Sequence, residues 1–153
     1  IHTYTIEYET GHQLKHLNKF DELYWNVTGN GWSFRMDSVS CAIILPKGAA
    51  PLSNKCYTGS QGSTAENCTV TVSTAGDSSI VVFKTTKSLR PQQGLTVATS
   101  WPKGFVKGPG LWQRIKFLIW NNKAAFLLPV AALFSIIFCF VFWIKYGLSL
   151  IHI

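Results

Sequence analysis

The sequence predicts a mainly β protein: an antiparallel β-sandwich over residues 1–104, followed by a short interfacial helix and one transmembrane helix. Three observations lead to this prediction. Short runs of alternating apolar and polar residues, separated by turn residues, recur before residue 104. Residues 111–120 have helical periodicity. The 21 residues from 124 to 144 carry no charge, and a helix of that length spans roughly 31 Å, the thickness of a hydrocarbon core.

The first expected strand covers residues 2–10. Tyr4, Ile6 and Tyr8 would share one side of this strand and alternate with threonine and glutamate, which indicates a half-buried strand. Residues 11–20 are largely polar and are expected to be a connection rather than a strand.

The remaining strands are expected between turn signals and prolines. They cover residues 23–27, 32–36, 39–45, 69–73, 79–85 and 94–101. Loops are expected over residues 47–54 and in the Gly- and Ser-rich excursion between Cys56 and Cys68. Several short strands with turns between them predict an antiparallel sandwich.

Residues 105–110 are expected to form a Gly/Pro-rich linker, and residues 111–120 an amphipathic helix at the membrane surface. The transmembrane helix is expected over residues 124–146, after a break at Asn121 and Asn122. Pro129 lies near its start, where a missing backbone donor costs least. Tryptophans suit the headgroup region, and basic side chains can extend from it toward water. The side chains expected at the membrane interface are Trp112, Arg114, Lys116, Trp120, Lys123, Trp143 and Lys145.

Basic residues concentrate on the approach to the apolar stretch. The net charge is +7, and all 7 acidic residues lie before residue 78. A basic run near a bilayer attracts anionic headgroups at roughly 1 kcal/mol per residue, so a bilayer with anionic lipids is an expected partner. Nucleic-acid binding is not expected, because the sequence shows neither a recognisable binding module nor interleaved stacking aromatics.

The orientation in the membrane rests on conflicting signals. Four basic residues precede the span within about 20 residues and only Lys145 follows it, so the positive-inside rule opposes an extracytoplasmic β-domain. Long domains, however, translocate largely regardless of charge. The cysteines favour the opposite orientation, and we expect a cell-membrane protein with a single span here and its N-terminal domain outside the cytoplasm.

Cys56 and Cys68 are twelve residues apart, on either side of the Gly- and Ser-rich excursion. A disulfide between them would contribute about 3 kcal/mol in the chain-entropy model and would indicate an oxidising compartment. Two free thiols are the first alternative. A metal pair is the second, although no further Cys or His pair at ligand spacing accompanies them. Cys41 and Cys139 are expected to be small apolar residues.

No set of residues predicts catalysis, a cofactor or a metal site. His12 and His16 are expected in a surface loop. Asp21 and Glu22 would point to opposite faces of a strand, which is poor geometry for paired acid–base catalysis, and an ion pair with a neighbouring lysine or a charged turn is expected instead. The sequence has neither a nucleophile elbow with a partnered histidine nor a phosphate-binding glycine loop. An enzyme is therefore not favoured.

Tyr24, Trp25 and Trp32 belong to the densest aromatic cluster of the chain. Packing in the core of the sandwich is the first interpretation of these rings. The alternative is a binding surface for carbohydrate or peptide, made of exposed aromatic side chains.

Residues 148–153 resemble the translation of a common transposase sequencing adapter. We interpret them as a read-through artefact and assign them no function; a genuine amphiphilic tail is the alternative. The chain opens without a methionine inside a strand-like pattern, so the first part of the domain is expected to be missing.

The segment from Asp21 to Gly29, DELYWNVTG, resembles domain-of-unknown-function family 2207, the predicted bacterial membrane proteins. Other segments match the family pattern in the same order: His2 to Tyr8, Gly31-Trp32, Leu45-Pro46, Cys56, Gly59, Cys68, Leu95 to Val97 and Trp101 to Gly104. The resemblance implies a secreted N-terminal β-domain followed by transmembrane helices. It implies no reaction, because the family has no established activity.

Together these expectations describe a membrane-anchored extracytoplasmic β-domain that binds or scaffolds something at the bacterial cell envelope. Its partner would be a protein or an envelope polymer. The alternatives are a structural subunit of a larger membrane complex and an envelope enzyme whose catalytic residues lie outside this chain.

Overall fold

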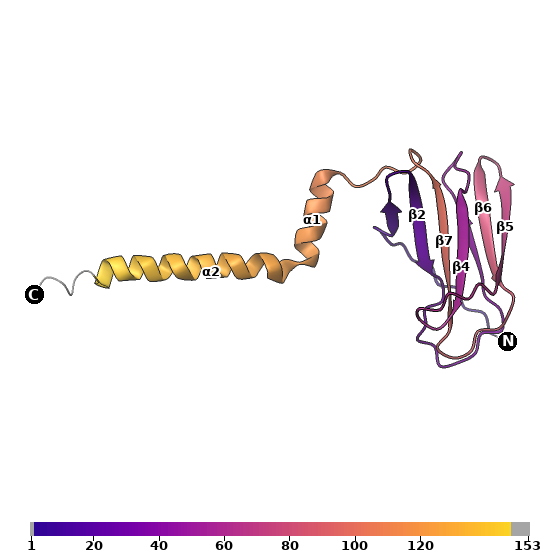
Figure 1. Cartoon of the computed structure of the whole chain (residues 1–153), viewed down its shortest axis with the longest axis horizontal. Helices are drawn as coiled ribbons and strands as arrows, with labels where there is room; N and C mark the ends of the chain where they lie inside the picture. The colour runs from indigo at the N-terminus through magenta and orange to yellow at the C-terminus, as the bar shows by residue number, and fades with distance from the viewer. Residues whose placement is uncertain (1, 148–153) are drawn as a thin grey trace, which may run out of the picture. The chain divides into compact units, whose positions relative to one another are not determined.

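The computed structural model describes residues 2–147 and contains, within them, seven strands, two α-helices and a final π-helical turn (Figure 1). The chain divides into two compact units, with the boundary between Lys107 and Gly108. The first unit, called the β-domain below, is made of strands, and the second is helical. The mainly β class and the antiparallel sheets that the sequence predicts are confirmed.

The β-domain consists of two antiparallel sheets. The four-stranded sheet has the order β1 (Leu14–His16), β2 (Phe20–Asn26), β7 (Gly94–Pro102) and β4 (Ser53–Gly59). The three-stranded sheet has the order β3 (Ser40–Ile44), β6 (Ser78–Thr85) and β5 (Cys68–Ala75). The two longest central strands, β6 and β7, each pair on both sides.

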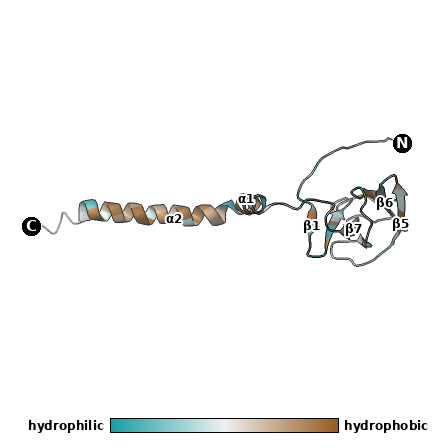
Figure 2. Cartoon of the chain, turned by 90° about the horizontal axis from the view of Figure 1, so that it is seen from above, coloured by the Kyte–Doolittle hydropathy of each residue, from teal (hydrophilic) through white to brown (hydrophobic). Residues whose placement is uncertain are grey.

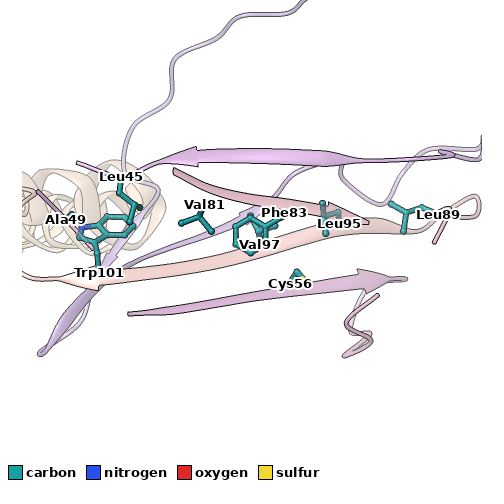
Figure 3. Packing of buried hydrophobic residues seen from close by; sticks show 9 residues of the cluster. All are labelled: Leu45, Ala49, Cys56, Val81, Phe83, Leu89, Leu95, Val97 and Trp101. Carbon is teal, nitrogen blue, oxygen red and sulfur yellow. The ribbon is translucent and has the colours of Figure 1, made fainter. Parts of the chain in front are cut away.

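The core lies between the two sheets. Val81 and Phe83 of β6 alternate toward it, as do Leu95 and Val97 of β7, and all four side chains have 0% exposure. Figure 3 shows Phe83 next to Val97, with Trp101 and Leu45 together near one end. This alternation is the period-2 signal of a strand with one buried face, and burying each such side chain stabilises the fold by about 1.5–3 kcal/mol.

The prediction of a strand over residues 2–10 is wrong. Within the described chain this segment pairs with no strand, and Tyr4 and Ile6 are 85% and 84% exposed. Alternation is a local property, whereas a strand exists only where a neighbouring backbone completes its hydrogen bonds. The segment has the pattern of a strand but lacks the pairing.

Three other expectations are corrected. Residues 11–20 are not only a connection, because they contain β1, which pairs with β2. Residues 32–36 form no strand, and only a single bridge joins Met36 to Leu89. Parts of both expected loops, residues 53–54 and 56–59, belong to strand β4, which pairs regularly with β7 although its sequence is polar.

The second unit begins with α1 (Leu111–Asn121) and continues with α2 (Lys123–Phe142) and a π-helical turn (Trp143–Gly147). The side chain of Gln113 accepts a hydrogen bond from the Gly110 N–H at 3.0 Å, which satisfies one of the free donors at the start of α1. The side chain of Asn122 donates to the Leu118 carbonyl at 2.9 Å, at the break between the helices.

One helical stretch among the described residues, Lys123–Gly147, is long and apolar enough to cross a membrane, with a mean hydropathy of 2.7. Figure 2 shows hydrophobic residues along the length of α2. None of its side chains is buried within the protein, as expected for a helix whose solvent is lipid. The residues interpreted as a sequencing artefact, 148–153, lie outside the described part of the chain.

Candidate functional site

The outer face of the four-stranded sheet carries the best candidate site. Strand alternation directs Leu23 and Trp25 of β2 toward the core and places Tyr24 and Asn26 on the opposite face. The register of β7 with β2 and β4 aligns Thr96 with both Asn26 and Tyr57. Three strands therefore bring two tyrosines and several polar groups to one surface.

Tyr24 and Tyr57 approach each other on this surface. Their ring centroids are 6.4 Å apart, with an angle of 38° between the ring planes. The ammonium group of Lys15 lies 4.8 Å from the centroid of the Tyr24 ring and 3.8 Å from a carboxylate oxygen of Glu22. A cation over an aromatic face is favourable by about 0.5–1 kcal/mol at exposed sites, so Lys15 helps to hold Tyr24 in position.

The loop after β4 forms a wall beside the two tyrosines. The Asn30 side chain donates a hydrogen bond to the Gly59 carbonyl at 3.0 Å, and it accepts one from the Asn26 side chain at 2.9 Å. The Ser63 hydroxyl donates to the Thr58 carbonyl at 2.9 Å. Gly59 has a φ of 121°, and a Cβ atom there would lie 2.7 Å from the Ser63 hydroxyl oxygen. Glycine is therefore required where the loop leaves β4.

Between this wall and the sheet lies a groove of about 460 Å³, called the tyrosine groove below. Besides the two tyrosines, its lining includes Asn26, Asn30 and Gln61. Every described residue that lines it is uncharged. Ring faces, amides and hydroxyls without charge can bind a neutral, hydrogen-bonding ligand.

A second pocket, of about 560 Å³, lies on the other side of the same loop. It is called the basic pocket, because Lys87 and Arg90 line it and no acidic residue does so among those described. Gly59, Ser60 and Ser63 line both the basic pocket and the tyrosine groove. The loop thus has an uncharged cavity on one side and a cationic cavity on the other.

The predicted disulfide between Cys56 and Cys68 is confirmed. Cys56 is buried on the inner face of β4, Cys68 begins β5, and their Cα atoms are 6.6 Å apart. The bond therefore joins the two sheets, in addition to closing the loop that separates the two cavities. Cys41 and Cys139 are free thiols. Burial raises the pKa of the Cys41 thiol.

The three aromatic residues expected as a core cluster or a binding surface are separated by the fold. Tyr24 is 46% exposed and lines the tyrosine groove, whereas Trp25 packs against the core. Trp32 is 48% exposed, and its ring is tilted by 44° against the Phe34 ring with the centroids 5.1 Å apart. Its indole N–H donates to the Thr28 carbonyl at 2.6 Å. Trp25 thus packs against the core as the first interpretation expects, whereas Tyr24 and Trp32 are exposed on the surface, where ligand binding stays a prediction.

The acidic and histidine candidates have structural partners. Asp21 is 2% exposed, and its Oδ1 atom lies 2.8 Å from Nδ1 of His16 and 4.0 Å from Nζ of Lys103. Glu22 points the other way and pairs with Lys15, so the two carboxylates occupy opposite faces, as alternation predicts. His16 therefore belongs to strand β1 and not to a surface loop. Within residues 2–147, no three His, Cys, Asp or Glu side chains gather in a metal-binding group.

The residues expected at the membrane interface lie in the helical unit. Trp112, Arg114 and Lys116 are exposed on α1, and the Arg114 side chain donates to the Pro109 carbonyl at 3.1 Å. Lys123 lies 3.7 Å from the centroid of the Trp120 ring, at the start of α2. The other two, Trp143 and Lys145, belong to the π-helical turn at the far end of the apolar stretch.

The residues of these cavities that sequence reasoning missed include Tyr57, Asn30, Lys87 and Arg90. Tyr57 is not predicted as a site residue, because the polar sequence of β4 predicts a loop. The alternation of Asn54, Cys56 and Thr58 toward the core is the signal that could have placed it on the opposite face. No local signal connects Lys87 and Arg90 with Gly59, because only the fold brings these segments together.

Comparison with known proteins gives one family match. Residues 1–101 match the family model described as "Predicted membrane protein (DUF2207) N-terminal domain". No curated protein matches the chain. No solved structure matches it either.

Proposed function

The chain belongs to the DUF2207 family of predicted membrane proteins, and on this basis we propose that its β-domain is held on the outer side of a bacterial cell membrane and binds an envelope component there. The apolar helix Lys123–Gly147 would be the anchor. The β-domain would present its grooves to the partner.

The disulfide is the observation that carries the extracytoplasmic placement. Disulfides persist in oxidising compartments and are rare in the reducing cytosol. The bond between Cys56 and Cys68 connects two sheets of one domain, so it has a structural place in the fold. A domain that depends on this bond is best suited to the outer side of the membrane.

The flanking charges oppose this orientation and need an explanation. Lys107, Arg114, Lys116 and Lys123 all precede the apolar helix. Positive charges influence membrane orientation most strongly when they lie in short loops. A domain of about 100 residues is translocated largely regardless of charge. On the outer surface these residues would contact anionic headgroups, each contributing roughly 1 kcal/mol near the bilayer.

Binding is favoured over catalysis by what the grooves contain. The tyrosine groove has no charged lining residue among those described, and Asp21 and His16 are paired with each other in the interior. General acid–base catalysis near neutral pH most often uses a histidine or carboxylate side chain within reach of a substrate, and no such side chain lines the groove among the described residues. Uncharged amides, hydroxyls and tyrosine rings support recognition instead.

A second candidate function is docking within a larger membrane complex. The Trp32 and Phe34 rings contact each other and are 48% and 54% exposed, and aromatic residues are enriched at protein interfaces. This surface is separate from Tyr24 and the tyrosine groove, so substitutions can distinguish the two functions.

Thiol labelling of intact cells tests the placement. In a Cys41→Ser, Cys139→Ser background, a membrane-impermeant maleimide should label Cys56 and Cys68 only after treatment with an impermeant reductant. Labelling without reductant would refute the disulfide in the cell. A Cys56→Ser control, which leaves Cys68 unpaired, should be labelled without reductant.

A fusion tests the orientation independently. Alkaline phosphatase joined after Lys145 should be inactive and a fluorescent protein at the same position should fluoresce, because the helix would deliver both to the cytoplasm. Active phosphatase at this position would reverse the proposed topology.

A further inference from the structure

We propose that the tyrosine groove and the basic pocket together bind one ligand, an acidic oligosaccharide. Its sugar rings would lie against Tyr24 and Tyr57, and an acidic group of the same chain would reach Lys87 and Arg90. This inference rests on the proposed function, because it names the class of envelope component that the β-domain recognises.

The tyrosine groove has the chemistry that a sugar ring requires. A pyranose has an apolar C–H face and a rim of hydroxyl groups, so it needs a flat apolar surface with hydrogen-bonding groups around it. The ring centroids of Tyr24 and Tyr57 are 6.4 Å apart, and Tyr side chains are amphipathic contact surfaces of low conformational entropy. Asn26, Gln61 and Thr96 surround these rings with amide and hydroxyl groups that can both donate and accept.

The basic pocket would give the site a preference for ligands with an anionic group. Neither Lys87 nor Arg90 forms an ion pair within the described residues, and both side chains are exposed. Hydrogen bonds between guanidinium or ammonium groups and an anion are roughly twice as strong as neutral ones. A carboxylate or phosphate group on the sugar chain would therefore find two unpaired cations and no competing acidic side chain.

The two cavities lie against the same loop, the one after β4. Gly59, Ser60 and Ser63 line both of them, so a single extended ligand can cross the loop from one cavity to the other. Their volumes, about 460 and 560 Å³, each fall within the range of roughly 300–1,000 Å³ typical of small-molecule sites. This size favours several sugar units over a single small anion.

The loop between the cavities is held in place before any ligand binds. Asn30 connects it to the turn after β2, Ser63 connects it to Thr58, and the disulfide fixes β4 and β5 beneath it. A wall that is already fixed does not lose conformational entropy on binding. The loop therefore acts as a preformed partition with a different chemistry on each side.

Single-stranded nucleic acid also combines stacking rings with anionic groups, but the site fits it less well. Its phosphates recur at every unit, so a matching protein surface has basic residues along the whole track. The tyrosine groove has none among its described lining residues. The separation of an uncharged cavity from a cationic one fits a polymer in which neutral and acidic sugars alternate.

Calorimetry on the purified full chain in detergent micelles tests the inference. The probe is an oligogalacturonate of about six units with half of its carboxyl groups methyl-esterified, and the fully esterified oligomer is its uncharged control. We expect the half-esterified probe to bind at least about tenfold more tightly than the control, because charge-assisted hydrogen bonds are roughly twice as strong as neutral ones. Equal affinity for both oligomers would refute the role of the basic pocket.

Two sets of variants assign the binding to the site. Tyr57→Ala should weaken both oligomers about tenfold, as truncation of an aromatic anchor does, whereas Tyr57→Phe should keep most of the affinity. The double variant Lys87→Gln, Arg90→Gln should weaken only the half-esterified probe. Its matched control is Lys47→Gln, Lys84→Gln, which removes the same charge from exposed residues outside both cavities.

The outcomes separate this inference from the proposed function. Equal losses in the two double variants would show attraction to net charge alone and overturn the site. Tighter binding of an oligothymidylate than of either sugar probe would replace the sugar ligand by nucleic acid. If no probe binds while the disulfide is intact and the β-rich circular dichroism spectrum is retained, the inference is overturned. The labelling and fusion experiments would still decide the membrane topology.

Discussion

The Nδ1 atom of His16 lies 2.8 Å from the Oδ1 atom of Asp21, and the two residues face each other across the β1–β2 hairpin. The Asp21 side chain is 2% exposed and the His16 side chain 16%. Lys103, just after β7, approaches the same carboxylate oxygen at 4.0 Å. These contacts stabilise the attachment of the short edge strand β1 to the rest of the sheet.

Removal of the Asp21 carboxylate should therefore destabilise the β-domain. Asp21→Ala leaves His16 without its partner in a poorly hydrated site, and a buried polar group without a hydrogen bond costs about 1–3 kcal/mol. Urea unfolding of the full chain in detergent, followed by tryptophan fluorescence, measures this loss. Glu22→Ala is the matched control: its pair with Lys15 is partly exposed, so its loss should cost less than about 1 kcal/mol. Equal costs for the two variants would contradict the buried role of Asp21.

Most of the fold could be predicted, because the sequences of most strands alternate between apolar and polar residues according to which side chains are buried. In β3, β6 and β7 the alternation of apolar side chains follows from which face meets the core, and the sequence shows it directly. The pattern misleads at residues 2–10, where the same alternation occurs without a partner strand. It also fails at β4, whose buried residues include a threonine and a cysteine instead of large apolar side chains.

Less of the candidate site could be predicted, because it is assembled by register. Tyr24 stood out as part of an aromatic cluster, but its ring partner Tyr57 is 33 residues away and meets it only across β7. The same is true of Asn30 and Gly59, whose hydrogen bond forms the wall of the groove. A local pattern contains no information about such distant contacts, whereas Cys56 and Cys68 were identified because cysteine chemistry is specific.

The disulfide should contribute substantially to stability. The double variant Cys56→Ser, Cys68→Ser should unfold with a free energy lower by about 3 kcal/mol, because the closed loop restricts the unfolded chain. Urea unfolding under non-reducing conditions measures the difference, with Cys41→Ser, a free thiol, as the control. If a reductant destabilised the native chain no more than it does the double variant, the predicted contribution of the bond would be refuted.

Alkylation of Cys41 should show a displaced pH dependence. Burial raises the pKa of this thiol above its usual value, and only the thiolate is nucleophilic, so less of the reactive form is present at a given pH. Below the raised pKa, Cys41 should react with iodoacetamide more slowly than an unperturbed thiol, and its rate should continue to rise at higher pH. Mass spectrometry of the Cys139→Ser variant, native and in urea, measures both profiles. Coincident profiles would show that burial does not affect the thiol.

At Gly94 the turn after β2 packs closely on β7. A Cβ atom at this position would lie 2.5 Å from the Gly29 carbonyl oxygen and 2.9 Å from the Thr28 hydroxyl oxygen. That hydroxyl accepts a hydrogen bond from the Leu95 N–H at 3.0 Å. Gly94→Ala must push the turn away from the strand, and overpacking of this kind costs about 1–3 kcal/mol.

The displaced turn also carries Asn30, which holds the wall of the tyrosine groove through Gly59. Gly94→Ala should therefore weaken ligand binding in addition to lowering stability. Gly31→Ala is the matched control, because a Cβ atom at Gly31 meets nothing within 4 Å. Urea unfolding and calorimetry with the half-esterified oligogalacturonate measure the two effects. If Gly94→Ala lowered stability but left the affinity unchanged, the turn would pack against β7 without shaping the groove, and Asn30 would lose its assigned role in positioning the wall.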